Sequence, residues 1–132
     1  MQDKLNFMVT LRLNRLNANL VNQHSCVVLI DDVAVYTTSL ANNKFFGELP
    51  VSFSTALDFG PHTLKVQYTN TAGTGNLRIE NIYVGAPASS GINCDSLLTR
   101  ESTGNLTLKN NETYCLTFNS PFFYWALSKF PI

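Results

Sequence analysis

The sequence predicts an all-β fold: a single-domain antiparallel β-sandwich of jelly-roll type over residues 1–132. Two observations carry this prediction. Apolar and polar residues alternate with a period of two, most clearly over 60–70 and 76–84, as in half-buried strands. Turn-forming residues separate roughly seven to ten short stretches of this kind, and no segment shows a comparably strong helical pattern.

The N-terminal region, residues 5–21, contains two overlapping patterns. Apolar side chains alternate from Phe7 to Leu13, which indicates a strand, whereas Leu13, Leu16 and Leu20 have the spacing of a helix. We predict a strand that ends at about Leu13. The asparagines that follow favour turns over a long helix.

The sequence pattern over residues 25–38 predicts a hairpin. Residues 25–30 form an apolar run, Asp31 and Asp32 follow, and 33–38 is again rich in β-branched and aromatic residues. Two such runs joined by a short acidic turn are typical of a β-hairpin. The alternation over 50–54 predicts a further strand.

The clearest strands are those over 60–70 and 76–84. From Leu64 to Tyr68 every second residue is apolar, and the later stretch repeats this pattern. The glycine-containing residues 71–75 between them are long enough for a hairpin loop, so we expect the two strands to be neighbours.

The composition changes after Val84. The small residues of 85–91 form the best internal boundary, but the remainder is too short for a second domain. We therefore expect 85–132 to be a C-terminal extension of the sandwich. Its strand candidates are 97–99, 105–108 and 114–118.

This extension ends in the most aromatic segment of the chain, which includes Phe122, Phe123, Tyr124 and Trp125. In a strand, consecutive apolar residues make both faces apolar, and only one face can meet the protein's own core. Two interpretations remain open: a core strand that closes the sandwich, or a contact with another chain. We take these four residues as interface candidates.

The composition also limits the partners. Nine Lys and Arg balance nine Asp and Glu, so the formal net charge is zero. Nucleic-acid binding requires a surplus of basic residues, and we expect no such partner.

No apolar run is long enough for a secretory leader or a membrane span, so we expect neither. Only 14% of the residues are charged, which suits a protein covered by neighbours in an assembly.

The three cysteines, Cys26, Cys94 and Cys115, allow at most one disulfide within the chain. We favour buried free thiols, because cysteine is often a small core residue. A bridge between Cys94 and Cys115 is the alternative. No Cys/His spacing is typical of a zinc site.

No constellation indicates catalysis. His24 and His62 are the only histidines, and neither has Ser or Cys at a recognised catalytic spacing. We interpret His62 as a turn residue with local hydrogen bonds. Asp31 and Asp32 are interpreted as solvated turn residues rather than as an acid/base pair, because Asp favours turns. We therefore expect no enzyme activity, no cofactor and no metal site.

The run from Val28 to Val84 resembles the β-sandwich carbohydrate-binding modules and the broader galactose-binding-like group. The matching elements are the strand and acidic turn 28–32, the Leu-x-x-Gly turn 57–60, the Gly-x-His-x-Leu-x-Val strand 60–66 and the strand 77–84.

The resemblance implies a glycan as a ligand, held by the loops over 38–48 and 70–76. The candidate ligand-binding residues are Asn42, Asn43, Asn70 and Asn76. Calcium-dependent members of the group carry acidic residues in the loop before the last strand. Here that loop contains no carboxylate, so we expect little affinity for calcium.

These observations lead to two functional expectations. The first is a non-enzymatic structural protein of a virion or extracellular surface appendage, such as a capsid, decoration or tail component, which self-associates or contacts neighbouring structural proteins. The charge-poor composition and the aromatic segment favour it. The alternative is a carbohydrate-binding module of a larger or secreted system, and a virion protein of the first kind could also adhere to glycans.

Overall fold

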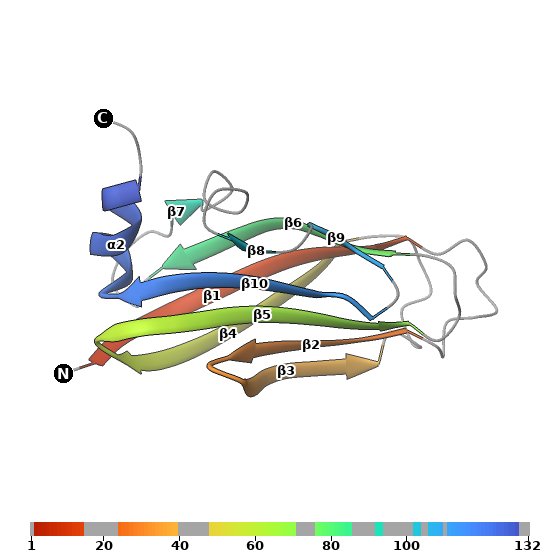
Figure 1. Cartoon of the computed structure of the whole chain (residues 1–132), viewed down its shortest axis with the longest axis horizontal. Helices are drawn as coiled ribbons and strands as arrows, with labels where there is room; N and C mark the ends of the chain where they lie inside the picture. The colour runs from red at the N-terminus through yellow and green to blue at the C-terminus, as the bar shows by residue number, and fades with distance from the viewer. Residues whose placement is uncertain are drawn as a thin grey trace.

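The structure is a computed structural model that describes residues 2–14, 24–39, 48–70, 76–85, 92–93, 102–103, 106–109 and 111–129. These residues form two antiparallel sheets that pack face to face, with one short helix at one end (Figure 1). The predicted all-β sandwich is confirmed.

Sheet A has the strand order β4-β1-β6-β7, and β9 also pairs with β6. Its strands are β1 (Gln2–Asn14), β4 (Glu48–Asp58), β6 (Asn76–Gly85), β7 (Ile92–Asn93) and β9 (Thr107–Leu108). Sheet B has the order β3-β2-β5-β10-β8. Its strands are β2 (His24–Ile30), β3 (Val33–Ser39), β5 (Gly60–Asn70), β8 (Ser102–Thr103) and β10 (Thr113–Ser120).

One hydrophobic core lies between the sheets. Along β1, β5, β6 and β10 the apolar half of each alternation points inward and is almost fully buried. The largest of these side chains are Tyr68, Tyr114, Phe7, Phe118, Phe122, Leu5, Leu11, Leu64, Leu77, Ile79 and Ile82. The polar half is left on the two outer faces.

The prediction that the strands over 60–70 and 76–84 form a hairpin is wrong, although both strands are present. β5 pairs with β2 and β10 in sheet B, whereas β6 pairs with β1 in sheet A. The chain therefore changes sheet between Asn70 and Asn76. A period of two is the same in either sheet, so the alternation identifies a strand without identifying its partner.

The predicted hairpin of β2 and β3 is confirmed. Ile30 faces Val33 in the register, and Asp31 and Asp32 form the two-residue turn. Their φ angles are 51° and 65°, and a type I′ turn has positive φ at both central residues. Asp tolerates this left-handed conformation better than most residues do.

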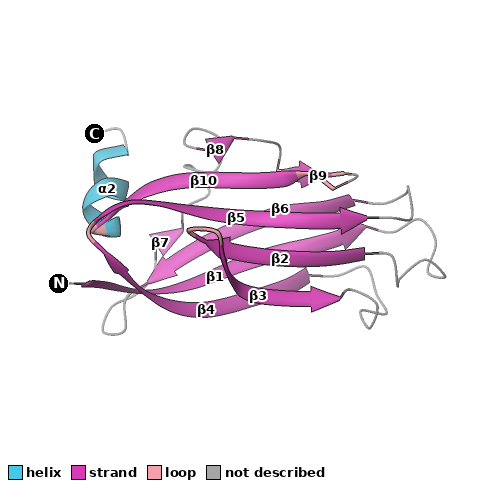
Figure 2. Ribbon diagram, turned by 60° about the horizontal axis from the view of Figure 1, so that its bottom comes forward, coloured by secondary structure: helices cyan, strands magenta, loops and turns pink. Residues whose placement is uncertain are grey.

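A sharp corner joins the sheets between β4 and β5. The strand predicted over 50–54 is longer than expected, because β4 continues to Asp58, and Phe59 alone separates it from β5 (Figure 2). Gly60 has a φ of 132°, which L-residues with a side chain rarely adopt. The space around Gly60 is open, so glycine is required here for its backbone conformation.

Residues 85–132 contribute strands to both sheets. The predicted strand 114–118 lies within β10, which pairs with β5 over Thr113–Ser120, and the predicted strand 105–108 overlaps β9. The candidate strand 97–99 and most of the boundary 85–91 fall outside the described residues.

The interpretation of the aromatic segment as a strand is wrong, because it forms helix α2 (Phe122–Lys129) at the end of the sandwich (Figure 1). Phe122 and Ala126, four residues apart, are buried on one face of this helix. Tyr124 is 81% exposed and Leu127 67% exposed on its outer side. A helix buries this run along one stripe, whereas a strand would have left one of its faces uncovered.

Asp3 of β1 fixes the start of α2. Its Oδ2 atom accepts hydrogen bonds from the Ser120 hydroxyl at 2.9 Å and from the Phe122 backbone N–H at 2.8 Å. The first N–H groups of a helix have no partner within the helix, and a carboxylate there also interacts favourably with the helix dipole. The N-terminal strand and the C-terminal helix are thereby joined.

Aromatic rings fill the core beneath this junction. Phe7 stacks on Phe53 with ring centres 5.1 Å apart and meets Phe122 edge-on at 6.3 Å. Phe118 lies 5.6 Å from Phe122 and 6.2 Å from Trp125. Edge-to-face and offset aromatic pairs add stability beyond the area that they bury.

We predict that Asp3→Ala lowers the free energy of unfolding by about 1–2 kcal/mol, because two donors at the helix start lose their acceptor. Urea denaturation followed by tryptophan fluorescence measures the change through Trp125. Gln2→Ala is the matched control, since Gln2 is exposed beside Asp3. Equal stabilities of the two variants would contradict this role of Asp3.

Candidate functional site

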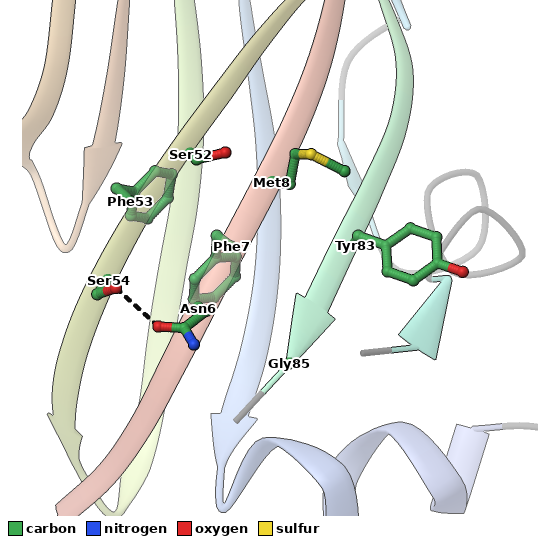
Figure 3. A pocket seen from close by; sticks show the side chains of 8 residues that line it. All are labelled: Asn6, Phe7, Met8, Ser52, Phe53, Ser54, Tyr83 and Gly85. Atoms are coloured by element: carbon green, nitrogen blue, oxygen red, sulfur yellow. Dashed lines mark hydrogen bonds between the residues drawn. The ribbon is translucent and has the colours of Figure 1, made fainter. Parts of the chain in front are cut away.

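The outer face of sheet A contains a depression of about 460 Å³ across β4, β1 and β6 (Figure 3). It is lined by Asn6, Phe7, Met8, Ser52, Phe53, Ser54, Tyr83 and Gly85. Because Phe7 is almost fully buried, it contributes to the floor. The exposed lining residues come from the polar half of the strand alternation.

The strand register arranges these residues in two rows across the sheet. Met8 lies between Ser52 and Tyr83, and two residues further along β1, Asn6 lies between Ser54 and Gly85. The side chains that flank Asn6 and Met8 on β4 are small, and Gly85 has none. The hollow therefore results from small residues beside larger ones.

The site offers polar groups next to an aromatic ring. The Ser54 hydroxyl donates to Asn6 Oδ1 at 2.7 Å (Figure 3), which orients the amide and leaves its Nδ2 group without an acceptor among the described residues. Tyr83 is 39% exposed and Met8 40% exposed. Hydrogen-bonding groups and an apolar platform are thus within one depression.

A second depression, of about 360 Å³, continues the first along β1 and β4. Its lining is Lys4, Leu5, Asn6, Ser54, Thr55 and Ala56, and it shares Asn6 and Ser54 with the first. We call the two together the sheet A groove. From Lys4 to Met8 it extends ~13 Å along β1, and Lys4 is the only charged residue in its lining.

Of the asparagines predicted from the loops, only Asn76 has a described side chain, and it does not line the groove. Asn42, Asn43 and the side chain of Asn70 lie outside the described residues. Asn76 is half-buried at the start of β6, whereas Tyr83 and Gly85 are near its other end. Seven residues of strand put Asn76 ~23 Å from Tyr83, so the structure does not bring it to the groove.

The four interface candidates differ in how much of each side chain is buried. Phe122 is fully buried within the chain and is therefore a core residue, which corrects its assignment to a contact surface. Phe123 and Trp125 are half-buried and pack against the core. Of the four, only Tyr124 is largely exposed.

Sequence reasoning missed Asn6, Met8, Ser52, Ser54 and Tyr83. Their only signal was their place in the polar half of each alternation, which every outward-facing residue shares. They form a site because β1 lies between β4 and β6. That strand order was not deducible from the pattern.

Two of the three cysteines fall in the described residues, and both are free thiols. Cys26 is fully buried, and this burial raises the pKa of its thiol to about 12. Cys115 is half-buried. Since Cys115 is free, it does not form the alternative bridge with Cys94, which itself lies outside the described residues.

Among the described residues, no group of three or more His, Cys, Asp or Glu side chains is placed to hold a metal ion. No helix in this part of the chain has the length and apolar composition needed to cross a membrane. No protein-family model and no curated protein sequence matches the chain.

We predict that Cys26 resists iodoacetamide at pH 8 in the folded protein, because a buried thiol with a raised pKa offers almost no thiolate. Peptide mass mapping should find it alkylated only after denaturation. Cys115 serves as the half-buried comparison in the same digest. Rapid alkylation of Cys26 under native conditions would contradict its place in the core.

Proposed function

We propose that the chain is a non-enzymatic binding module that takes a carbohydrate chain in the sheet A groove. The observation that carries this proposal is the lining, which combines hydroxyl and amide groups with exposed Tyr83 and Met8 and, among its described residues, has Lys4 as the only charge. This combination matches the two kinds of surface that a sugar presents.

A sugar ring has hydroxyl groups at its edge and C–H groups on its faces. Ser52 and the Nδ2 group of Asn6 supply hydrogen-bonding partners for the edge. The ring of Tyr83 supplies an apolar surface with a polar tip. The groove is open along β1 and β4, which suits an extended chain better than a small molecule that needs enclosure.

The sequence resemblance supports the same ligand class but a different location. It implied loop residues, whereas the groove lies on a sheet face formed by Asn6, Ser54 and Tyr83. The loop asparagines Asn42 and Asn43 remain a prediction, and a glycan could be bound at either place. Variants of the groove alone distinguish the two.

We predict that Tyr83→Ala and Asn6→Ala each weaken glycan binding about tenfold or more, a loss of ~1.4 kcal/mol. A glycan array identifies the ligand, and titration calorimetry with the best oligosaccharide measures the affinity, with and without a chelator. The matched control is Tyr124→Ala, which removes an exposed tyrosine of α2 that does not line the groove.

Two results would overturn the proposal. One is the absence of binding to any glycan on the array. The other is binding that survives the double variant of Tyr83 and Asn6, which would move the site to the loops. Loss of binding in the chelator would add a metal requirement that the described residues do not explain.

A second candidate function is a structural component of a virion or other extracellular assembly. The observation that favours it is the outer side of α2, where Tyr124 and Leu127 are both exposed. Exposed large apolar side chains on a charge-poor protein are typical of contact surfaces. Self-association, or contact with a neighbouring structural protein, would cover them.

For this second candidate we predict that the wild type self-associates with rising concentration and that Tyr124→Ser with Leu127→Ser keeps it monomeric. Size-exclusion chromatography with light scattering measures the mass. Val33→Ser is the control, because Val33 is exposed on the β3 edge away from α2. A wild type that stays monomeric at high concentration would argue against self-assembly through this helix.

A further inference from the structure

His62 occupies the corner where the two sheets meet. Its Nδ1 atom lies 2.5 Å from Asp31 Oδ2 in the β2–β3 turn, and its Nε2 atom lies 2.6 Å from the backbone oxygen of Asp58 at the end of β4. The side chain is only 12% exposed. One imidazole ring therefore contacts a turn of sheet B and the edge strand of sheet A.

Both partners of the ring can only accept hydrogen bonds. A backbone oxygen is always an acceptor, and an ionised carboxylate has no proton to donate. A neutral imidazole has one N–H and would present a lone pair to one of the two oxygens. Only the imidazolium form satisfies both contacts, so this geometry selects the protonated ring.

The Asp31 carboxylate extends the connection to β5. Its Oδ1 atom accepts from the Thr63 backbone N–H at 3.0 Å, and the Asp31 N–H donates to the Thr63 oxygen at the same distance. The turn, the start of β5 and the end of β4 are thus linked through one carboxylate and one ring.

We propose that His62 is a proton-dependent clasp, which in its protonated form holds the end of β4 and the β2–β3 turn together and in its neutral form releases one of them. β4 is the edge strand of sheet A, and among the described strands it pairs only with β1. Phe59 joins its end covalently to β5, and the clasp adds a side-chain link from this end to the β2–β3 turn.

The other charged groups at the corner have partners of their own. Lys65 on β5 donates to Asp32 at 2.6 Å, and the Asp58 carboxylate accepts from Gln2 at 3.4 Å. From β10, the ring of Phe118 faces His62 with centres 5.9 Å apart. Asp31 and Asp58 are the groups whose charge acts on the ring, and histidine is the side chain whose ordinary pKa lies closest to neutral pH.

The direction of the pH effect follows from the ring's surroundings. Burial acts to lower the pKa of His62, but the hydrogen bonds to the Asp58 oxygen and the Asp31 carboxylate, with the negative charge of Asp31, raise it above its ordinary value of 6.5 overall. A histidine whose pKa is raised in the folded state stabilises the fold fully below 6.5. That contribution is lost as the pH rises through the folded-state pKa.

The clasp also bears on the sheet A groove. Thr55 and Ala56, which line its second depression, come two to three residues before the Asp58 oxygen that His62 holds. Release of Asp58 would loosen this wall of the groove. This part rests on the proposed function, whereas the clasp itself can be tested without any ligand.

The test is NMR on the ¹⁵N-labelled full chain without ligand, between pH 5.5 and 8.5. We expect His62 to titrate above 6.5 with both ring N–H groups present below its pKa. After correction for intrinsic exchange, protection should fall about threefold or more between pH 6 and 8.5. The fall is expected at the Asp31 and Thr63 amides if the turn is released, and at the amides at the end of β4 if Asp58 is released. Amides of β1 report whether the sheet as a whole is affected.

Three variants separate the clasp from general effects on the corner. His62→Gln should make the amide protection independent of pH. Asp31→Asn keeps the left-handed turn and the acceptor for Thr63, because Asn favours this conformation, and should lower the His62 pKa. Lys65→Gln removes the neighbouring ion pair without a group that titrates in this range, and should retain the wild-type pH dependence.

The proposal is overturned if His62 titrates at or below 6.5, or if the Asp31 and Thr63 amides and the amides at the end of β4 all keep the same protection across the range. It is also overturned if His62→Gln retains the wild-type pH dependence. None of these results depends on glycan binding, so a failure of the proposed function would leave the clasp standing, and the reverse also holds.

Discussion

The structure depends on one constraint: each of the two sheets is apolar on one face, and these two faces pack together to form one buried hydrophobic core. Leu64, Val66 and Tyr68 of β5 face that layer from sheet B, while Leu77 and Ile79 of β6 face it from sheet A. Neither sheet can bury its apolar face alone, so each sheet covers the apolar face of the other. The outer faces are therefore left to polar and small residues, and the sheet A groove is one result.

Much of the fold could be predicted from the sequence, because apolar and polar residues that alternate with a period of two identify a strand. The strands β2, β3, β5, β6 and β10 fall where alternation or β-rich runs indicated them. Pairing could not be predicted in the same way, and the expected hairpin of β5 and β6 failed for that reason. The helix α2 was missed because its four adjacent aromatic residues suit a buried strand equally well. Asp3, more than a hundred residues away, accepts from the first N–H group of this helix, and the local sequence does not reveal such a long-range contact.

The candidate site was harder to predict than the fold. Asn6, Ser54 and Tyr83 come from three strands that are distant in sequence, and their proximity follows from strand order and register alone. The asparagines of the loops were chosen for their chemistry, and Asn76 lies at the wrong end of β6. His62 shows the same limit. Its bond to the Asp58 oxygen is the local contact that a turn residue was expected to make, but its bond to Asp31 crosses from β5 to the β2–β3 turn.

The junction between Asp3, Ser120 and Phe122 has a consequence for how the chain is made. During synthesis, β1 emerges before β4 and can pair with it as soon as residue 58 has left the ribosome. Phe7, however, gains Phe118 and Phe122 only once β10 and the start of α2 have been made. Until then Phe53 of β4 can stack on Phe7, but the rings of Phe118 and Phe122 are missing. The aromatic core at this junction is therefore completed late in folding, through contacts of long sequence separation.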